Sequence, residues 1–450
     1  MPRPGGPPPT KQHPAVTEVS VAGYKSIVSS VTAELSLLSI LAGANSAGKS
    51  SLIQPLLLLK QTIEAPYDPG ALKLDGPNVE FTKAEEFLSA APGRPRGETF
   101  EVGVRVGQGD ERVVFVFEQA GLNVKLAAVR YARGKRPENL IREDMSQREL
   151  LAQFGGEVHW HDEEEDPNTF QGEKRLSVER ERCFLRIRVS QGNAFWTIPL
   201  ASDEVGNVLR HLLHLPGLRG NLRRTYLAPE VRGPMPGKFS DYAASLVASW
   251  VESQDSRLER LNFALSTLEL TWKAHASRRD ASSVELFVAR TLKPLRGGAY
   301  DLVNVADAGF AISQTLPVAV ALVAADAGQV VYIEQPEIHL HPRAQVGLAK
   351  VVVSAVNRGV QVILETHSEL LLTSLRREIA EGTLSHEVVR LHWFSRDAAG
   401  ATRVTSSHID ETGAFGDWPV DFADVAMSED DAYATAAMKK LGTLKDERKR

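Results

Sequence analysis

The chain has 450 residues, of which 43% are hydrophobic and 24% charged, and this composition excludes collagen-like, mucin-like and mostly disordered proteins. Its 52 basic and 57 acidic side chains give a net charge of -5, so no overall positive field draws it to nucleic acid or to an anionic membrane. The single cysteine, Cys183, cannot form an internal disulfide. A reducing compartment is therefore favoured, and we expect the cytoplasm.

The first fourteen residues and the apolar runs predict neither a signal peptide nor a transmembrane helix. Residues 1–14 are rich in proline and lack an apolar run, which predicts a disordered tail rather than a signal peptide. The most apolar segments, 52–59 and 316–325, are shorter than the roughly 20 residues that cross a bilayer. We therefore expect no membrane contact.

The predicted elements begin with a strand at 16–21, a buried strand at 35–42 that ends in a glycine-rich loop, and a helix at 50–62. Alternating apolar and polar residues then predict antiparallel strands at 101–106, 113–117, 123–131, 184–189 and 194–200. One helical stretch is expected among them, near 137–154. Helical periodicity returns at 201–215 and 240–268, followed by a strand at 284–292.

The last part of the pattern alternates helices and strands: a loop and helix at 307–325, a strand at 330–333, a helix at 342–357 and a strand at 361–365. Strands that alternate with helices predict an α/β fold with a mostly parallel sheet covered on both faces.

The expected organisation has six parts. They are a tail (1–14), the N-terminal half of an α/β head (15–100), a β-rich insertion (101–200), a helical and β subdomain (201–300), the C-terminal half of the head (301–395) and a C-terminal extension (396–450).

A phosphate-binding motif is the strongest chemical signal. Residues 43–50 match G-x4-G-K-[ST] between a buried strand and a helix, which is the context that the motif requires. Backbone N–H groups of such a loop bind phosphate oxygens, Lys49 reaches the outer phosphates and the Ser50 hydroxyl ligates Mg²⁺. The residues expected to bind ATP are Gly43, Ala44, Asn45, Ser46, Ala47, Gly48, Lys49, Ser50 and Ser51.

Acidic residues follow a second apolar strand, in the run VVYIEQPEIHLHP at 330–342. An acid at the carboxyl end of a parallel strand lies beside the phosphate loop, so Glu334 is the candidate for holding Mg²⁺, usually through water. An acidic turn is the plainer alternative. A metal cluster of Glu337, His339 and His341 is another, although no further ligands accompany it.

A histidine, His367, follows the strand at 361–365. This position lets it point at the γ-phosphate or at the attacking water. A lone histidine of this kind is more often structural, but after a phosphate loop and an acidic strand end we expect a catalytic role.

These motifs, in this order, resemble the ABC-type ATPases of the SMC and overcoming-lysogenization-defect group. Within that group the chain is most similar to bacterial AAA/ABC-like ATPases with a short C-terminal domain of unknown function. The shared segments are 45–51, 56–61, 215–226, 309–314, 334–342 and the DWP sequence at 417–419.

The resemblance implies a P-loop NTPase head of the ABC type, in which two heads sandwich two ATP molecules. One head would offer Lys49, Ser50, Glu334 and His367, and the signature loop of the other would cap the γ-phosphate. That loop would comprise Asp307, Gly309, Ser313 and Gln314. The ATP-dependent homodimer would act on an effector or nuclease partner, or on DNA, in anti-phage defence or DNA maintenance.

Gln335 departs from the family pattern, because ABC ATPases usually have a water-activating glutamate there, and glutamine cannot accept a proton at pH 7. Glu337 is then the candidate substitute base. The alternative is a nucleotide-gated scaffold with negligible hydrolysis that sequesters a partner protein. No D-x-D follows Ser368, so a nuclease within this chain is not expected.

Overall fold

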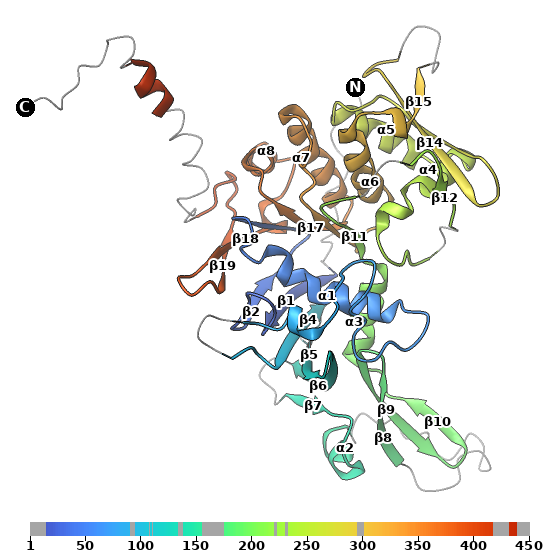
Figure 1. The fold of residues 1–450 in the computed structure, drawn as a ribbon, viewed down its shortest axis with the longest axis vertical. Helices are drawn as coiled ribbons and strands as arrows, with labels where there is room; N and C mark the ends of the chain where they lie inside the picture. Colours follow the sequence, from blue (N-terminus) through green and yellow to red (C-terminus); the bar gives the residue numbers. More distant parts are fainter. Residues whose placement is uncertain are drawn as a thin grey trace, which may run out of the picture.

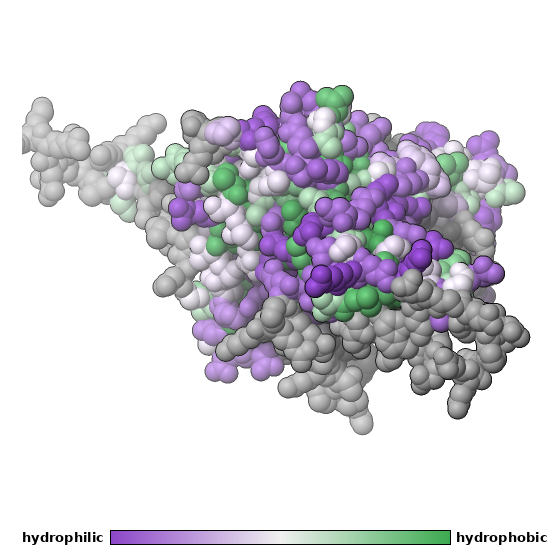
Figure 2. All heavy atoms as spheres, turned by 90° about the horizontal axis from the view of Figure 1, so that it is seen from below, coloured by the Kyte–Doolittle hydropathy of each residue, from purple (hydrophilic) through white to green (hydrophobic). Residues whose placement is uncertain are grey.

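The computed structural model describes residues 15–90, 95–107, 109, 111–133, 138–154, 175–219, 223–229, 233–294, 301–416 and 432–438. The expected tail at 1–14 and the DWP sequence at 417–419 lie outside these ranges. Within them, no helix is long and apolar enough to cross a membrane. On the face shown in Figure 2, hydrophilic residues predominate over the described part of the surface.

The central sheet has six strands in the order β11-β16-β17-β3-β18-β19. Their bounds are Leu213–Leu215 (β11), Val330–Glu334 (β16), Gln361–Thr366 (β17), Leu38–Gly43 (β3), Val389–Arg396 (β18) and Thr402–His408 (β19). The first five are parallel and β19 is antiparallel to β18. The predicted α/β fold with a mostly parallel sheet is confirmed.

Each face of this sheet packs against a different set of elements. Successive side chains of a strand point to opposite faces, so Val331 and Ile333 join one core while Val330 and Tyr332 join the other. The first core contains helices α6 (Phe310–Ala324), α7 (Pro342–Val356) and α8 (Glu369–Ala380), and the second contains α1 (Lys49–Ile63). Burial on both faces explains why β16 and β17 are almost continuously apolar.

A second six-stranded sheet is antiparallel and lies on the α1 side of the central sheet (Figure 1). Its order is β2-β1-β4-β5-β6-β7, with bounds Val31–Glu34 (β2), Val16–Ala22 (β1), Thr99–Val106 (β4), Glu111–Ala120 (β5), Asn123–Arg133 (β6) and Asn139–Ile141 (β7). Because β4 pairs with β1, the expected insertion shares a sheet with the N-terminal half of the chain. The expected boundary at residue 101 therefore falls inside a strand.

Two smaller units lie at opposite ends of the molecule (Figure 1). One is a three-stranded sheet of β8 (Arg175–Glu181), β9 (Phe184–Gln191) and β10 (Ala194–Thr197). The other combines α4 (Ala243–Glu252) and α5 (Arg257–Thr267) with a small sheet. That sheet comprises β12 (Tyr226–Leu227), β13 (Ala274–Arg278), β14 (Ser283–Ala289) and β15 (Leu302–Asn304).

Two predicted helices are shorter than expected. The helix over 201–215 ends at His211 (α3, Ala201–His211), and residues 213–215 form β11, which pairs in parallel with β16. The helix near 137–154 is confined to α2 (Gln147–Phe154) and follows strand β7. A three-residue strand has too few positions to show a period of its own, so its pairing decides its structure.

Candidate active site

The phosphate loop connects β3 to α1 and is held in a shape that needs glycine. Gly48 precedes α1 at φ 103°, and a Cβ there would lie 2.3 Å from the Thr402 Oγ1. The Thr402 hydroxyl donates to the Ala47 carbonyl over 2.8 Å, which ties the loop to β19. The Lys49 ammonium donates to the carbonyls of Gly43 (3.1 Å) and Ala44 (2.8 Å), so the loop is closed around this side chain.

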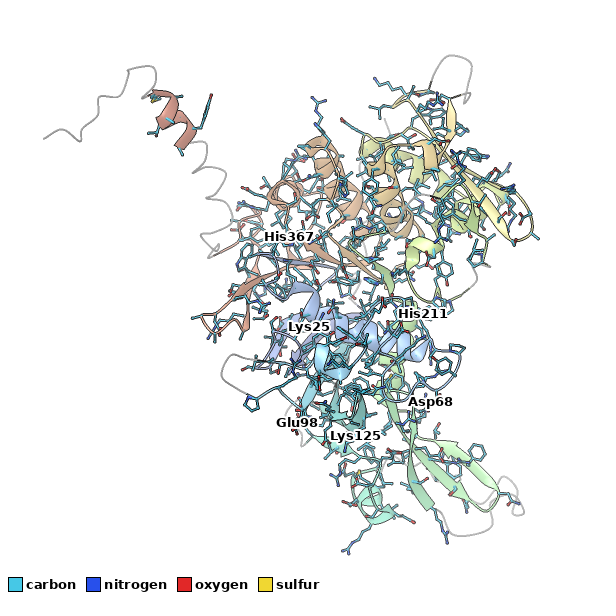
Figure 3. All side chains as sticks on the ribbon, in the orientation of Figure 1. Lys25, Asp68, Glu98, Lys125, His211 and His367 are labelled. Carbon is cyan, nitrogen blue, oxygen red and sulfur yellow. The ribbon has the colours of Figure 1, made fainter. Side chains whose placement is uncertain are left out.

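A cavity of about 730 Å³ opens at this loop. Of the expected loop residues it is lined by Asn45, Ser46, Gly48, Lys49, Ser50 and Ser51. Other strand ends contribute Gln335, Glu365 and His367, and the turn after β1 contributes Lys25. Figure 3 labels His367 and Lys25 in the region where the two large sheets meet. The cavity has the size of a small-molecule site, and the three strand ends converge on it as the sequence predicts.

Two carboxylates lie side by side at the edge of this cavity. Glu334 and Glu365 are paired neighbours at the ends of β16 and β17. The Ser50 hydroxyl donates to Glu365 Oε1 over 3.0 Å, and the Tyr332 hydroxyl donates to Glu365 Oε2 over 3.0 Å. Burial and the charge of Glu334 raise the pKa of Glu365. Buried oxygen ligands with excess negative charge fit a hard divalent cation, so this donor set suits Mg²⁺.

Glu334 is oriented by β11 and by the residues that follow it. Its Oε1 lies 3.1 Å from the His214 Nε2, and its Oε2 accepts from the Gly217 N–H over 3.2 Å. Burial opposes ionisation, but these two hydrogen bonds and the nearby charges hold the pKa of Glu334 below its usual range. The Arg219 guanidinium, which is 7% exposed, donates to the Glu334 carbonyl over 2.6 Å. The side chain and the backbone of Glu334 are therefore both fixed.

Glu337 and His367 are coupled to each other and to the phosphate loop. Glu337 Oε1 accepts from the Thr366 hydroxyl and from the His367 N–H, both at 2.8 Å. Glu337 Oε2 is buried and has no hydrogen-bond partner among the described residues. Burial and the charge of Lys49 lower the pKa of His367, whose ring bonds to the Gly43 carbonyl. A neutral His367 and a carboxylate with one free oxygen therefore lie next to Lys49.

The expected signature residues divide into two pairs. Asp307 and Gly309 are exposed, and Asp307 forms a bidentate ion pair with Arg224 at 2.6 and 3.0 Å. Ser313 and Gln314 are only 6% and 2% exposed, and Gln314 Oε1 accepts from the Arg219 N–H. The burial of Ser313 and Gln314 within their own head does not favour direct contact with a second head.

The two histidines of the HLH sequence do not form a metal cluster with Glu337. The His339 ring packs edge-on against Phe310 with 4.6 Å between centroids, and the His341 side chain accepts from the Arg343 N–H at the start of α7. No group of three or more metal-ligating side chains occurs in the ranges that the structure describes.

Sequence reasoning missed several residues that shape this site. The sequence predicts only that Glu365 ends an apolar strand, although it occupies the same strand-end position as Glu334. His214 lies in the segment predicted as a helix, and Arg219 follows that segment. Arg396 ends the unpredicted strand β18, lines the cavity and donates to the Ser46 carbonyl over 2.8 Å. Of these residues, only Glu365 had a sequence signal, because it is an acid at the end of an apolar strand.

A family comparison gives one match. Residues 239–373 match an AAA domain. The family is described as "AAA domain, putative AbiEii toxin, Type IV TA system". The matched range contains β16, α7 and β17, with Glu334, Glu337 and His367, and excludes the phosphate loop. A search of curated proteins gave no match.

Solved structures give distant likenesses to SMC heads. An SMC head bound to the C-winged helix domain of ScpA has a TM-score of 0.48 at 10% identity, covering 88% of this chain and 99% of the other. The SMC head domain from Thermotoga maritima gives 0.38 at 9% identity, covering 87% and 98%. The Smc head with an extended coiled coil bound to the C-terminal domain of ScpA, from Pyrococcus furiosus, gives 0.42 at 10% identity, covering 94% and 100%. Likenesses at these scores carry no information on ligands.

Proposed function

We propose that the chain is an ATP-binding ATPase that uses Mg²⁺. The observation that carries the proposal is the cavity of about 730 Å³ in which the phosphate loop faces the ends of β16 and β17. Loop N–H groups and the N-terminus of α1 favour phosphate, and Lys49 supplies a positive charge for the outer phosphates. Ser50, Glu334 and Glu365 would hold Mg²⁺, which neutralises phosphate charge when bound.

Glu337 is the proposed base in place of Gln335. A base needs a carboxylate oxygen that is not already occupied, and the buried Glu337 Oε2 meets this condition. The contacts of its Oε1 with Thr366 and His367 fix its orientation. His367, kept neutral by burial and by Lys49, can donate a hydrogen bond to phosphate without repelling Lys49.

Gln335 supports the second candidate, a nucleotide-gated scaffold with negligible hydrolysis. Its amide lines the cavity where related ATPases have a base. The two candidates agree on ATP binding and differ in turnover.

A binding measurement tests what both candidates share. A fluorescent ATP analogue should bind the full chain with Mg²⁺ and bind the Lys49→Ala variant at least tenfold more weakly. Lys125→Ala is the matched control, because Lys125 is an exposed lysine on β6. Equal affinity in all three proteins would contradict the proposal.

We also propose that two chains dimerise on ATP and act on an effector or on DNA, in anti-phage defence or DNA maintenance. The exposed Asp307 and Gly309 are the surface residues on which the dimer would rest. Two arginines near the site are engaged within the chain, Arg219 by the Glu334 carbonyl and Arg224 by Asp307, so the support for DNA is the resemblance alone. Light scattering of the Glu337→Gln variant should give twice the monomer mass with ATP and the monomer mass with ADP. An unchanged mass would contradict dimerisation.

A further inference from the structure

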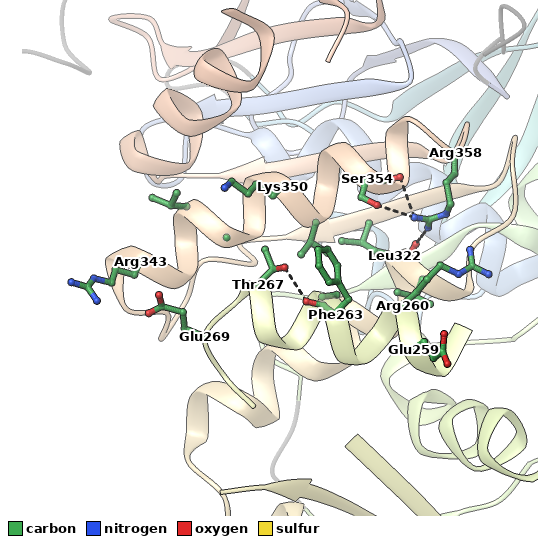
Figure 4. Close-up of a pocket in the computed structure, with 15 residues that line it drawn as sticks. Glu259, Arg260, Phe263, Thr267, Glu269, Leu322, Arg343, Lys350, Ser354 and Arg358 are labelled. Carbon is green, nitrogen blue, oxygen red and sulfur yellow. Dashed lines mark hydrogen bonds between the residues drawn. The ribbon is translucent and has the colours of Figure 1, made fainter. Parts of the chain in front are cut away.

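A second cavity lies on the helical side of the central sheet, away from the phosphate loop. It has a volume of about 750 Å³ and is bounded by α5, the end of α6 and α7 (Figure 4). A Cβ at Gly347 would lie 2.2 Å from the Thr267 carbonyl, so α7 and the end of α5 touch along the groove. We call this cavity the α5–α7 groove.

The floor of the α5–α7 groove is apolar. It is formed by Ala264, Leu322, Val323, Val346 and Val351. Phe263 is 76% exposed although it is a large aromatic residue, and Figure 4 shows its ring between α5 and α7. An open apolar surface with an exposed aromatic ring is typical of a binding site.

The rim of the groove is mainly basic. Four cations, Arg260, Arg343, Lys350 and Arg358, line it together with two acids, Glu259 and Glu269. Within the described ranges, no carboxylate forms an ion pair with any of the four cations. Arg358 instead donates to the Ser354 carbonyl over 3.0 Å, and burial and the charge of Arg260 lower its pKa. The groove therefore presents positive charge that its own side chains leave uncompensated.

One segment of the chain has the complementary chemistry. Residues 417–431, DWPVDFADVAMSEDD, carry six acids and no base, interleaved with Trp418, Val420, Phe422, Val425 and Met427. The other dense acidic run, 162–166, contains no apolar residue. Apolar side chains spaced among acids match an apolar floor with a basic rim, in the way that peptides bind grooves between helices.

The described stretch 301–416 ends close enough for the residues that follow it to reach the groove. Phe415 lies under the Arg376 guanidinium of α8 at 5.5 Å, and α8 packs against α7. Crossing α8 and α7 requires about 20 Å, because each helix with its side chains is about 10 Å wide. The seven residues from Phe415 to Phe422 can span up to about 25 Å.

We propose that the α5–α7 groove binds the acidic segment 417–431 of the same chain. The apolar residues of the segment contact Phe263 and the floor, and its carboxylates pair with Arg260, Arg343 and Lys350. This intramolecular contact ties the C-terminal extension to α7, the helix that follows directly after Glu337 and His339. It does not depend on nucleotide.

Cross-linking of the full chain tests the proposal. Lys350 is exposed and Cys183 is completely buried, so the Lys350→Cys, Phe422→Cys variant has two reactive thiols. With a short bis-maleimide, we expect the 350–422 cross-link to form at least tenfold faster than the cross-link in a Lys125→Cys, Phe422→Cys control. Residue 125 is exposed and lies on β6, far from the groove (Figures 1 and 3).

Two further measurements isolate the charge contribution and the identity of the occupant. Adding Arg260→Glu to the cross-linking variant, or raising the salt to 1 M, should slow the reaction severalfold because the ion pairs are removed or screened. A rate equal to that of the Lys125→Cys control, or one insensitive to Arg260→Glu, would overturn the proposal. Mixed-isotope cross-links from a mixture of ¹⁴N and ¹⁵N chains would also overturn it, because they would identify a second copy as the occupant.

Discussion

His214 is the residue whose replacement tests the proposed Mg²⁺ site most specifically. It is 1% exposed, stacks on Tyr332 with 5.4 Å between ring centroids, and places its Nε2 3.1 Å from the Glu334 Oε1. The His214→Phe variant keeps the stack and the approximate volume but removes both ring nitrogens. The expected result is a loss of the orientation of Glu334 with little change in the phosphate loop.

The magnitude follows from what the imidazole does. Partners of metal ligands typically contribute ten- to hundredfold to metal affinity or activity, which is about 1.4–2.7 kcal/mol. We therefore expect the Mg²⁺ concentration for half-maximal phosphate release to rise ten- to hundredfold in His214→Phe. Loss of the contact between His214 Nδ1 and the Asn78 Oδ1, at 3.0 Å, adds a stability cost of about 1–3 kcal/mol.

The assay separates these two effects. Phosphate release is measured against Mg²⁺ concentration, binding of ATP is measured without Mg²⁺, and thermal unfolding is measured without ligand. His275→Phe is the control, since His275 lies on β13 in a different sheet. An unchanged Mg²⁺ requirement in a folded His214→Phe protein would refute the assignment of Glu334 as a ligand oriented by His214.

Three other changes have defined outcomes. Glu337→Gln should lower phosphate release by about 10²–10⁴-fold with ATP binding retained, as expected for loss of a general base, and full turnover would exclude that role. Thr402→Val removes the hydroxyl that donates to the Ala47 carbonyl. This variant should lower the unfolding free energy by about 1 kcal/mol and weaken ATP binding. If both the unfolding free energy and the ATP affinity are unchanged, this account of the loop is contradicted. Burial lowers the pKa of His392 to about 4, so the folded state disfavours its protonation and stability is lost as pH falls from about 6.5 to 4. His392→Gln should reduce that loss in urea unfolding by about 3 kcal/mol, and an identical pH profile would show that His392 does not cause it.

The parts of the fold that could be predicted from sequence are those buried on both faces or periodic over several turns. β16, α7 and β17 were expected within one or two residues of their observed bounds. Their apolar runs reflect cores on both sides of the sheet. The short strand β11 and the pairing of β4 with β1 depend on partners distant in sequence, and local pattern does not record such partners.

In the candidate site, too, only the residues that belong to a local sequence pattern could be predicted. Lys49, Ser50, Glu334 and His367 lie in motifs with a fixed place relative to a strand end, and three of them line the cavity; Glu334 lies next to Glu365, which lines it as well. His214 belongs to no such motif. It reaches Glu334 only because β11 pairs with β16, which is a tertiary contact between residues 120 positions apart.

Phosphate release by the purified full chain with Mg²⁺ and ATP, measured beside Lys49→Ala, tests the central claim most directly. The account predicts a measurable wild-type rate that falls at least a hundredfold in Lys49→Ala, because this ammonium is expected to contact the outer phosphates. A wild-type rate no higher than that of Lys49→Ala would contradict the claim that this chain is an ATPase.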